Sequence, residues 1–493
     1  MAFPKFMLSF LLALLSISGM AQLSGSNLFE FQLGNLPDAD PPDLSAHYDQ
    51  LNLQYRYKSL KATVRYEQFL TQTPSSSYTR LTQYTLQYRK EGLDIKVGNF
   101  SEILGNGLLL RAYEIPGSVF EEQAYRVRYG FYRDLRGVSV KYNGDYGYVK
   151  AVRGRTLANS LPPTLDEDDR RPDLSEGIEA GLSRFGQTAG LVFMRNTNGP
   201  IKDSFYSLLL NGNIFSIFSY NFEFAHNIAN SLPLFQLTED ARYGIYASLN
   251  YSYGNFGLSA EYKDYQDLLI GAGISDPPTL VKEHKYKLLN RSIHVPQIFN
   301  EKGSQLEAYY SFRNGSRLLL NYARAVNRIV NEFIFTEYFA ELNFDAGAKH
   351  DFTVFADYSS DEIKFENNRY TGGFIWEYAL ERKHSTLLEV EYQSVERNLG
   401  APVLFNNLVV IAGYTYSPNT SIAFTWELSS DPNLVPAGEQ RHWIGLDFSQ
   451  KLNANNTISL FAGQRRGGPA CTSGVCYEVL DFEGIEIRFK TKF

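Results

Sequence analysis

The chain has 493 residues, a formal net charge of −7 and 15% aromatic residues, with 34 Tyr and 35 Phe but only 3 Trp. Mean hydropathy is −0.28, a value typical of soluble proteins. No basic cluster indicates nucleic-acid binding, and helical periodicity is nearly absent, so composition excludes a nucleic-acid-binding or a helical protein. No Pro/Ser-rich linker divides the chain, and we expect one continuous β domain.

The first residues have the features of a secretory signal peptide. A basic residue precedes an apolar run from Phe6 to Ile17, and small residues lead to Ala21. We expect cleavage near Ala21–Gln22 and export of the remaining chain. The apolar run is too short to cross a bilayer as a helix, and no other stretch has the roughly 18 uncharged apolar residues that such a helix needs.

Apolar and polar residues alternate in runs of about ten, the length of a tilted transmembrane strand. Such runs include 51–57, 218–224 and 421–428. In the last run, 485–493, isoleucines and phenylalanines fall on one side and charged residues on the other. An apolar face toward lipid and a charged face toward a wet lumen are typical of a membrane barrel, although a soluble sandwich could also end in such a strand.

Turn spacing favours the barrel over a large soluble β protein. Very short connections containing Gly or Asn alternate with longer polar loops, as in outer-membrane barrels with short periplasmic turns and long extracellular loops. The short connections lie at 58–59, 91–92, 143–145, 254–255, 313–315 and 418–419. The longer loops lie at 154–175, 226–241, 265–303, 395–403, 429–439 and 465–476.

These patterns predict an all-β protein, a single transmembrane antiparallel β-barrel of roughly 22–24 strands in the outer membrane. Residues 1–21 form the signal peptide, 22–46 an N-terminal segment that could supply a first strand, and 47–493 the barrel. An even strand number places both termini in the periplasm. The N-terminal segment is too short to fill so wide a lumen, so we do not expect an energy-coupled receptor with a plug domain.

A segment between Gly98 and Arg128 interrupts the alternation with three consecutive leucines flanked by glycines. Glycine permits sharp backbone turns, so the segment could fold into the barrel and bury its leucines there. A wall strand with a bulge is the alternative. If the pore has a constriction, we expect it at Arg111, Tyr113 and Glu114. The residues that we expect to face the lumen and set its field are Arg56, Arg65, Glu67, Arg89, Glu223, Glu389 and Glu391.

The only two cysteines, Cys471 and Cys476, flank a Gly-containing turn. Exported proteins occupy oxidising compartments, so we expect a disulfide at the tip of the last extracellular loop. A metal would need two further ligands, and no histidine accompanies the pair, so we expect no metal and no cofactor. We also expect no enzyme activity, because no histidine lies in a nucleophile motif; His284 and His294 could reach the extracellular rim as ordinary polar residues.

Two segments resemble an uncharacterised family of Bacteroidota outer-membrane proteins, a domain of unknown function. The first segment reads Gly98-Asn99-Phe100, Gly105-x-Gly107-Leu108 and Leu110-Arg111-x-Tyr113-Glu114. The second reads Gly467-Gly468-x-x-Cys471-x-x-Gly474-Val475-Cys476, then Phe482-x-Gly484 and Phe493. The family carries a basic residue after the second Cys, where this chain has Tyr477, which argues against a charge-based role there. The resemblance implies location and architecture, and no chemistry.

We therefore expect a porin-like passive channel of the cell outer membrane. The alternative is a barrel subunit of an envelope secretion, assembly or surface complex without open-pore activity. Expected partners are outer-membrane lipid and lipopolysaccharide, the barrel assembly machinery through the C-terminal Phe493, and envelope proteins, but no nucleic acid.

Overall fold

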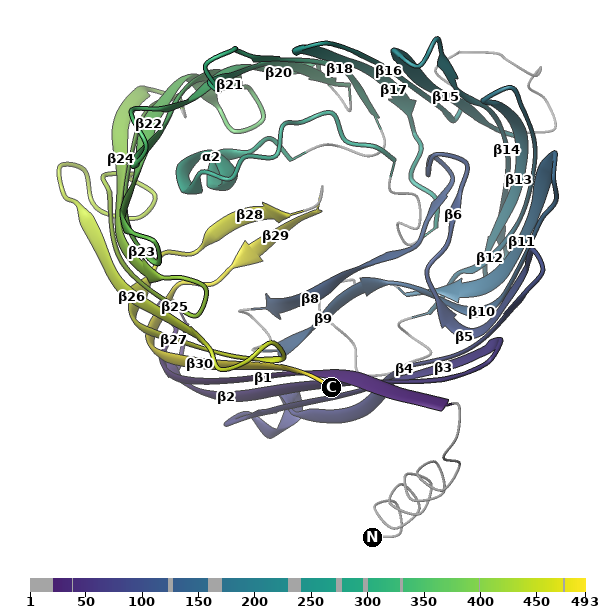
Figure 1. The fold of residues 1–493 in the computed structure, drawn as a ribbon, viewed down its shortest axis with the longest axis horizontal. Coiled ribbons are helices and arrows are strands. Elements are labelled where there is room, and N and C mark those ends of the chain that lie inside the picture. The colour runs from purple at the N-terminus through teal and green to yellow at the C-terminus, as the bar shows by residue number, and fades with distance from the viewer. Residues whose placement is uncertain are drawn as a thin grey trace, which may run out of the picture.

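The computed structural model describes residues 21–37, 39–122, 127–157, 171–228, 241–271, 277–295, 300–328, 331–398, 400–472 and 475–493. One closed antiparallel sheet of 24 strands surrounds a lumen (Figure 1). Each strand pairs with the next wall strand along the chain, and the last pairs with the first. The prediction of an all-β antiparallel barrel is confirmed, at the upper end of the expected strand number. The predicted signal peptide falls outside the described residues, apart from its last residue.

The wall strands follow one another in chain order. The first twelve are β1 (Ala21–Asn35), β2 (Asp43–Tyr57), β3 (Leu60–Thr71), β4 (Tyr78–Lys90), β5 (Leu93–Phe100), β10 (Leu135–Asn143), β11 (Gly147–Thr156), β12 (Leu174–Arg184), β13 (Gln187–Asn198), β14 (Ile201–Ile214), β15 (Phe218–Asn227) and β16 (Tyr243–Tyr253). The other twelve are β17 (Phe256–Gln266), β18 (Asn300–Ser311), β19 (Arg317–Asn327), β20 (Phe333–Asp345), β21 (His350–Asp361), β22 (Glu366–Glu381), β23 (His384–Asn398), β24 (Pro402–Tyr416), β25 (Thr420–Ser429), β26 (Arg441–Lys451), β27 (Asn456–Arg465) and β30 (Phe482–Lys492).

The barrel closes between its first and last strands. β1 pairs with β30 from Ser26, opposite Lys492, to Asn35, opposite Glu483. Beyond this ladder the amide of Gly25 donates to the carbonyl of Phe493 at 2.7 Å, and the amide of Phe493 donates back at 3.0 Å. Because every strand edge is paired, the sheet has no free edge. Apart from its first residue, Ala21, β1 lies in the N-terminal segment 22–46, which therefore contributes to the wall.

Alternation along the strands gives the wall its two faces. On β13, Leu191 and Phe193 are 59% and 44% exposed on the outer surface, whereas Val192 and Met194, which alternate with them, are 2% and 0% exposed. Outward apolar side chains suit contact with lipid. No helix among the described residues has the length and apolar composition needed to cross a bilayer.

The two ends of the barrel differ in their connections. At one end, which we call the short-turn end, neighbouring strands are joined by connections as short as 58–59 and 91–92. Lys58 and Glu91 have φ angles of 49° and 48°, and Gly92 has 83°, as tight hairpin turns require. Both ends of the described chain also lie here. The opposite end, which we call the long-loop end, carries the longer connections. Short and long connections thus alternate between the two ends as the sequence predicts.

Three connections at the long-loop end fold back into the lumen, where Figure 1 shows them inside the ring of strands. The first inner segment comprises the described residues 101–122 and 127–134, with β6 (Ile103–Leu104), β7 (Leu110–Arg111), β8 (Tyr113–Glu122) and β9 (Val127–Arg133). The second inner segment comprises the described residues 267–271 and 277–295, with α2 (Lys287–Ser292). The third inner segment comprises the described residues 466–472 and 475–481, with β28 (Gly468–Thr472) and β29 (Val475–Val479). A 3-10 turn, η1 (Pro74–Ser76), connects β3 to β4.

Candidate functional site in the filled lumen

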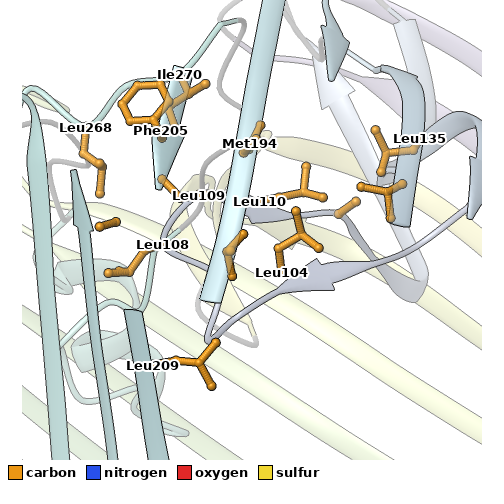
Figure 2. Packing of buried hydrophobic residues seen from close by; sticks show 14 of the residues in the cluster. Leu104, Leu108, Leu109, Leu110, Leu135, Met194, Phe205, Leu209, Leu268 and Ile270 are labelled. Atoms are coloured by element: carbon orange, nitrogen blue, oxygen red, sulfur yellow. The ribbon is translucent and has the colours of Figure 1, made fainter. Parts of the chain in front are cut away.

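The first inner segment contacts the wall mainly through leucines. Leu104, Leu108, Leu109 and Leu110 are all 0% exposed. Figure 2 shows them packed against side chains that point inward from the wall. The wall contributes Leu135, Val152, Val192, Met194, Phe205, Leu209, Ala225 and Tyr265, and the second inner segment adds Leu268 and Ile270. Burying a leucine stabilises by about 1.5–3 kcal/mol, so this packing is enough to order the segment. The run of leucines therefore forms no bulged wall strand.

Two wall carboxylates hold the turn between β6 and β7. The amide of Gly105 donates to Glu179 Oε2 at 3.0 Å, and the amide of Asn106 donates to Glu223 Oε2 at 2.5 Å. Gly105 has a φ of +60°, and a Cβ there would lie 2.5 Å from Glu223 Oε1. Glycine is favoured at this position, because a side chain would be strained at this backbone angle and would displace the Glu223 carboxylate. Glu223 also accepts from Ser207 Oγ at 2.6 Å.

The β8–β9 part of the first inner segment contacts the wall strands β1, β3 and β4, on the other side of β5. Glu114 forms an ion pair with Arg65 on β3 at 2.5 Å, and Arg128 forms one with Glu30 on β1 at 2.9 Å. The hydroxyl of Tyr78 on β4 donates to the carbonyl of Arg128 at 2.8 Å. The first inner segment is therefore attached to two distant parts of the wall.

The second inner segment is held mainly by wall acids. The amides of Lys287 and Leu288, at the start of α2, each donate to a different carboxylate oxygen of Glu391 at 2.8 Å. Glu427 receives Lys287 Nζ at 3.3 Å and Arg291 at 3.0 Å. Next to α2, the ring of Tyr286 stacks on a wall phenylalanine, and its hydroxyl donates to Glu341 at 2.6 Å.

Two histidines of the second inner segment are buried against wall carboxylates rather than lying at the rim. His284 Nε2 lies 3.1 Å from Glu337 Oε1. His294 lies 3.0 Å from Asp361 and 3.5 Å from Glu301. Burial lowers the pKa of His294, but the hydrogen bonds and charges of these two carboxylates outweigh it and hold the pKa above its ordinary value.

Two further cations hold the end of α2. Lys364 Nζ donates to the carbonyls of Ser292 and Ile293 at 3.0 and 2.6 Å, and Arg369 donates to the carbonyl of Ser292 at 2.8 Å. Burial and the neighbouring charge of Arg369 lower the pKa of Lys364 to about 8. Cations that donate to the last carbonyls of a helix satisfy groups that the helix itself leaves unpaired.

The third inner segment joins the other two. β28 packs against α2, and β29 packs against β8 (Figure 1). Arg466 donates to Asn407 of the wall at 3.0 Å, and its pKa falls to about 10 through burial and the nearby charge of Arg291. The hairpin that we expected at the tip of an outer loop thus lies inside the barrel.

Within that hairpin, Cys471 and Cys476 are directly opposite each other in the β28–β29 register. Their side chains lie outside the described residues, so the disulfide stays a prediction.

The other residues selected from the sequence do not form one site. Arg111 and Tyr113 form a cation–π contact at 4.9 Å within the first inner segment. Glu67 is buried and accepts from Gln50 at 3.2 Å. Arg89 is exposed near the short-turn end and pairs with Asp94 at 2.5 Å. The remaining two are Arg56, which is exposed near the same end, and Glu389, which is half-buried two residues before Glu391.

Sequence reasoning missed most of the groups that hold the second inner segment. The missed carboxylates lie on wall strands and include Glu337, Asp361 and Glu427. The alternation along a strand did not show which loop residues each carboxylate would meet. One signal was present: residues 282–294 contain four lysine or arginine residues and two histidines, within a chain of net charge −7. A basic loop beside acidic strands predicts contact, although not which carboxylate meets which cation.

A polar pocket of about 970 Å³ lies inside the barrel at the short-turn end. Its lining includes Arg65 and Glu114, so the ion pair between the first inner segment and the wall forms part of its boundary. Other polar lining residues are Ser24, Ser26, Gln50, Asn52, Gln54, Gln83, Lys490 and Lys492.

The closed antiparallel sheet and its inward loops define an outer-membrane-type β-barrel with three of its own connections inside the lumen. The chain belongs to a family of unknown function (DUF6029), whose sequence profile matches residues 38–157 and 272–493. Those two ranges contain the first and third inner segments and nearly all of the second.

Solved structures with a similar fold include other outer-membrane barrels. The translocation pore of the P pilus usher (PapC) is 10% identical over 96% of this chain and 99% of that chain, with a TM-score of 0.48. A mutant of the ferric enterobactin receptor (PfeA) from Pseudomonas aeruginosa is 10% identical over 96% of this chain and 81% of that chain, with a TM-score of 0.49. OccK3 (OpdO) from Pseudomonas aeruginosa is 13% identical over 76% of this chain and 96% of that chain, with a TM-score of 0.41. These likenesses concern the fold alone. A comparison with curated proteins finds none that matches this chain.

Proposed function

We propose that the chain is an integral protein of a bacterial outer membrane that acts as a porin-like passive channel, narrowed by its three inner segments. The observation that carries this proposal is the polar pocket inside a closed barrel whose outer face is apolar. The short-turn end would face the periplasm and the long-loop end the outside, as in single-chain barrels. Export by the predicted signal peptide and a Bacteroidota origin belong to the same proposal.

Passage through such a channel needs no cofactor and no catalytic group. A solute would move between the inner segments and the wall, past the ion pair of Arg65 with Glu114. Charges of both signs line the pocket, so we expect weak selectivity between anions and cations. Removing one charge of the pair should shift that selectivity without changing the fold.

Planar-bilayer conductance of the detergent-purified protein tests this proposal. We expect small steps for the wild type and steps on the nanosiemens scale after residues 102–133 are replaced by a short Gly/Ser linker. Glu114→Gln should change the reversal potential in a salt gradient, with Asp145→Asn, an exposed carboxylate in the turn between β10 and β11, as control. Heat modifiability on gels establishes folding of each variant. Silence of both the wild type and the linker variant would reject the channel.

A second candidate is a barrel subunit of an envelope secretion, assembly or surface complex without open-pore activity. The observation that favours it is the contact between all three inner segments, which places ordered protein across the lumen. A silent, folded wild-type barrel that purifies from its native membrane in a stoichiometric complex would support this function. Open conductance of a barrel that purifies alone would reject it.

A further inference from the structure

A cluster of three metal-ligating side chains lies where the second inner segment meets the wall. His284 comes from the segment, Glu337 from β20 and Asp357 from the neighbouring strand β21. One ligand atom of each lies within 4.8 Å of the others. The three residues are 3%, 1% and 5% exposed.

Several atoms of this cluster have no hydrogen-bond partner within the described part of the chain, although they are buried. They are His284 Nδ1, Glu337 Oε2 and Asp357 Oδ2. Leaving a buried polar atom without a partner costs about 1–3 kcal/mol, and more when the group is charged. One oxygen of each carboxylate is satisfied, by His284 Nε2 at 3.1 Å and by Ser359 Oγ at 3.2 Å. The cluster therefore presents one further acceptor on each residue.

The described residues supply no lysine or arginine that pairs with either carboxylate of the cluster. The charge of Arg369 acts on Asp357, but its guanidinium is bonded instead to the carbonyl of Ser292 and to Glu366. Two buried carboxylates and an imidazole without a paired cation form a site of negative charge. The neighbouring cluster at His294 differs, because Lys263 pairs there with Glu301 at 2.5 Å.

We infer that His284, Glu337 and Asp357 bind a divalent transition-metal cation such as Zn²⁺. An imidazole nitrogen with two carboxylate oxygens matches the ligands of Zn²⁺, whereas Ca²⁺ and Mg²⁺ prefer oxygen ligands alone. Ligand atoms lie about 2.0–2.2 Å from a bound zinc ion, so binding requires the three ligand atoms to draw closer together than they are here. A water molecule completes the tetrahedral coordination.

The ion would connect the second inner segment to two wall strands. It binds fully only when the segment lies inward, because one ligand comes from the segment and two from the wall. Binding therefore stabilises the inward position relative to any position in which the segment has left the wall. This role is independent of whether the barrel conducts.

Metal content of the full-length, detergent-purified protein tests the site. After treatment with EDTA and removal of the chelator, the protein is incubated with Zn²⁺, desalted and analysed by mass spectrometry for zinc per chain. We expect one zinc ion in the wild type. Calorimetric titration should show at least tenfold weaker affinity for His284→Ala and for Asp357→Asn, which keeps the shape of the side chain.

His226→Ala is the matched control, because it removes a buried histidine of β15, outside the second inner segment, and should keep the zinc. Heat modifiability shows which variants fold. If His284→Ala fails to fold, the zinc content of Asp357→Asn alone tests the site. X-ray absorption at the zinc edge should show nitrogen and oxygen ligands without sulfur, since sulfur would indicate the cysteines instead. A wild-type protein without zinc, or equal zinc in wild type and Asp357→Asn, overturns the proposal.

Discussion

The first and second inner segments occupy the same lumen, but apolar burial holds the leucine-rich part of the first, whereas ion pairs and hydrogen bonds hold most of the second. The first inserts four fully buried leucines among apolar side chains of β10–β17. The second places lysines, an arginine and two histidines against carboxylates of β18–β25. Apolar burial depends little on pH or salt, whereas ion pairs and histidine contacts depend on both. The two segments should therefore respond to different conditions.

This contrast shows that the inner face of a barrel wall can be apolar over some strands and acidic over others. On β13 both faces are apolar, since Val192 and Met194 point inward as Leu191 and Phe193 point outward. On β23 the inward side carries Glu389, Glu391 and Gln393. Each inner segment matches the polarity of the wall strands that it covers. A substitution in one segment, or in the strands that it contacts, should therefore release that segment and leave the other in place.

The largest expected effect is the release of the first inner segment by Leu109→Asp. A carboxylate at this 0% exposed position would be buried without a partner, which costs about 4 kcal/mol. We expect larger conductance steps and new protease cleavage within residues 101–134. Leu109→Met, which conserves volume, should behave as the wild type. Unchanged cleavage in the Asp variant would show that the leucines do not hold the segment.

A smaller effect is expected when the second inner segment loses its contact at α2. Glu391→Ala removes the acceptor of two backbone amides, and the loss of two buried hydrogen bonds costs about 2–3 kcal/mol. Limited proteolysis should cut within residues 267–299 and spare the first inner segment. The exposed carboxylate variant Glu377→Gln provides the control. Cleavage in both segments would mean that they are ordered together.

A pH dependence should distinguish the two segments further. Because the folded pKa of His294 is raised, its contacts with Asp361 and Glu301 stabilise fully below about pH 6.5, the usual unfolded value. This stabilisation is lost as pH rises through the folded pKa. Protease cleavage within 267–299 should therefore increase with pH relative to His294→Gln, while cleavage within 101–134 should not. Equal pH profiles for the wild type and His294→Gln would contradict the assignment.

The smallest effect concerns the third inner segment, which touches both of the others. If Cys471 and Cys476 form the predicted disulfide, reduction should destabilise the hairpin by at most about 2–3 kcal/mol, because the closed loop is short. Thiol labelling of the mature protein should occur only after reduction. Conductance should change less on reduction than in Leu109→Asp. Labelling of both cysteines before reduction would exclude the disulfide.

Several properties follow from the sequence alone. The strands, their short turns and the even strand number follow from period-two alternation and turn composition, because lipid contact and hairpin geometry act on nearby residues. The leucine run 108–110 and its flanking glycines also indicated an inward segment, although a bulged strand fitted equally well.

Only the tertiary structure decided which groups meet inside the lumen. Glu391 meets the amides of Lys287 and Leu288 more than a hundred residues away, and His284 meets Glu337 across 53. Alternation states which face of a strand a residue occupies, but it does not state how far a loop reaches or which strand it covers. Those contacts depend on closure of the whole barrel, since only closure brings distant strands around one shared lumen.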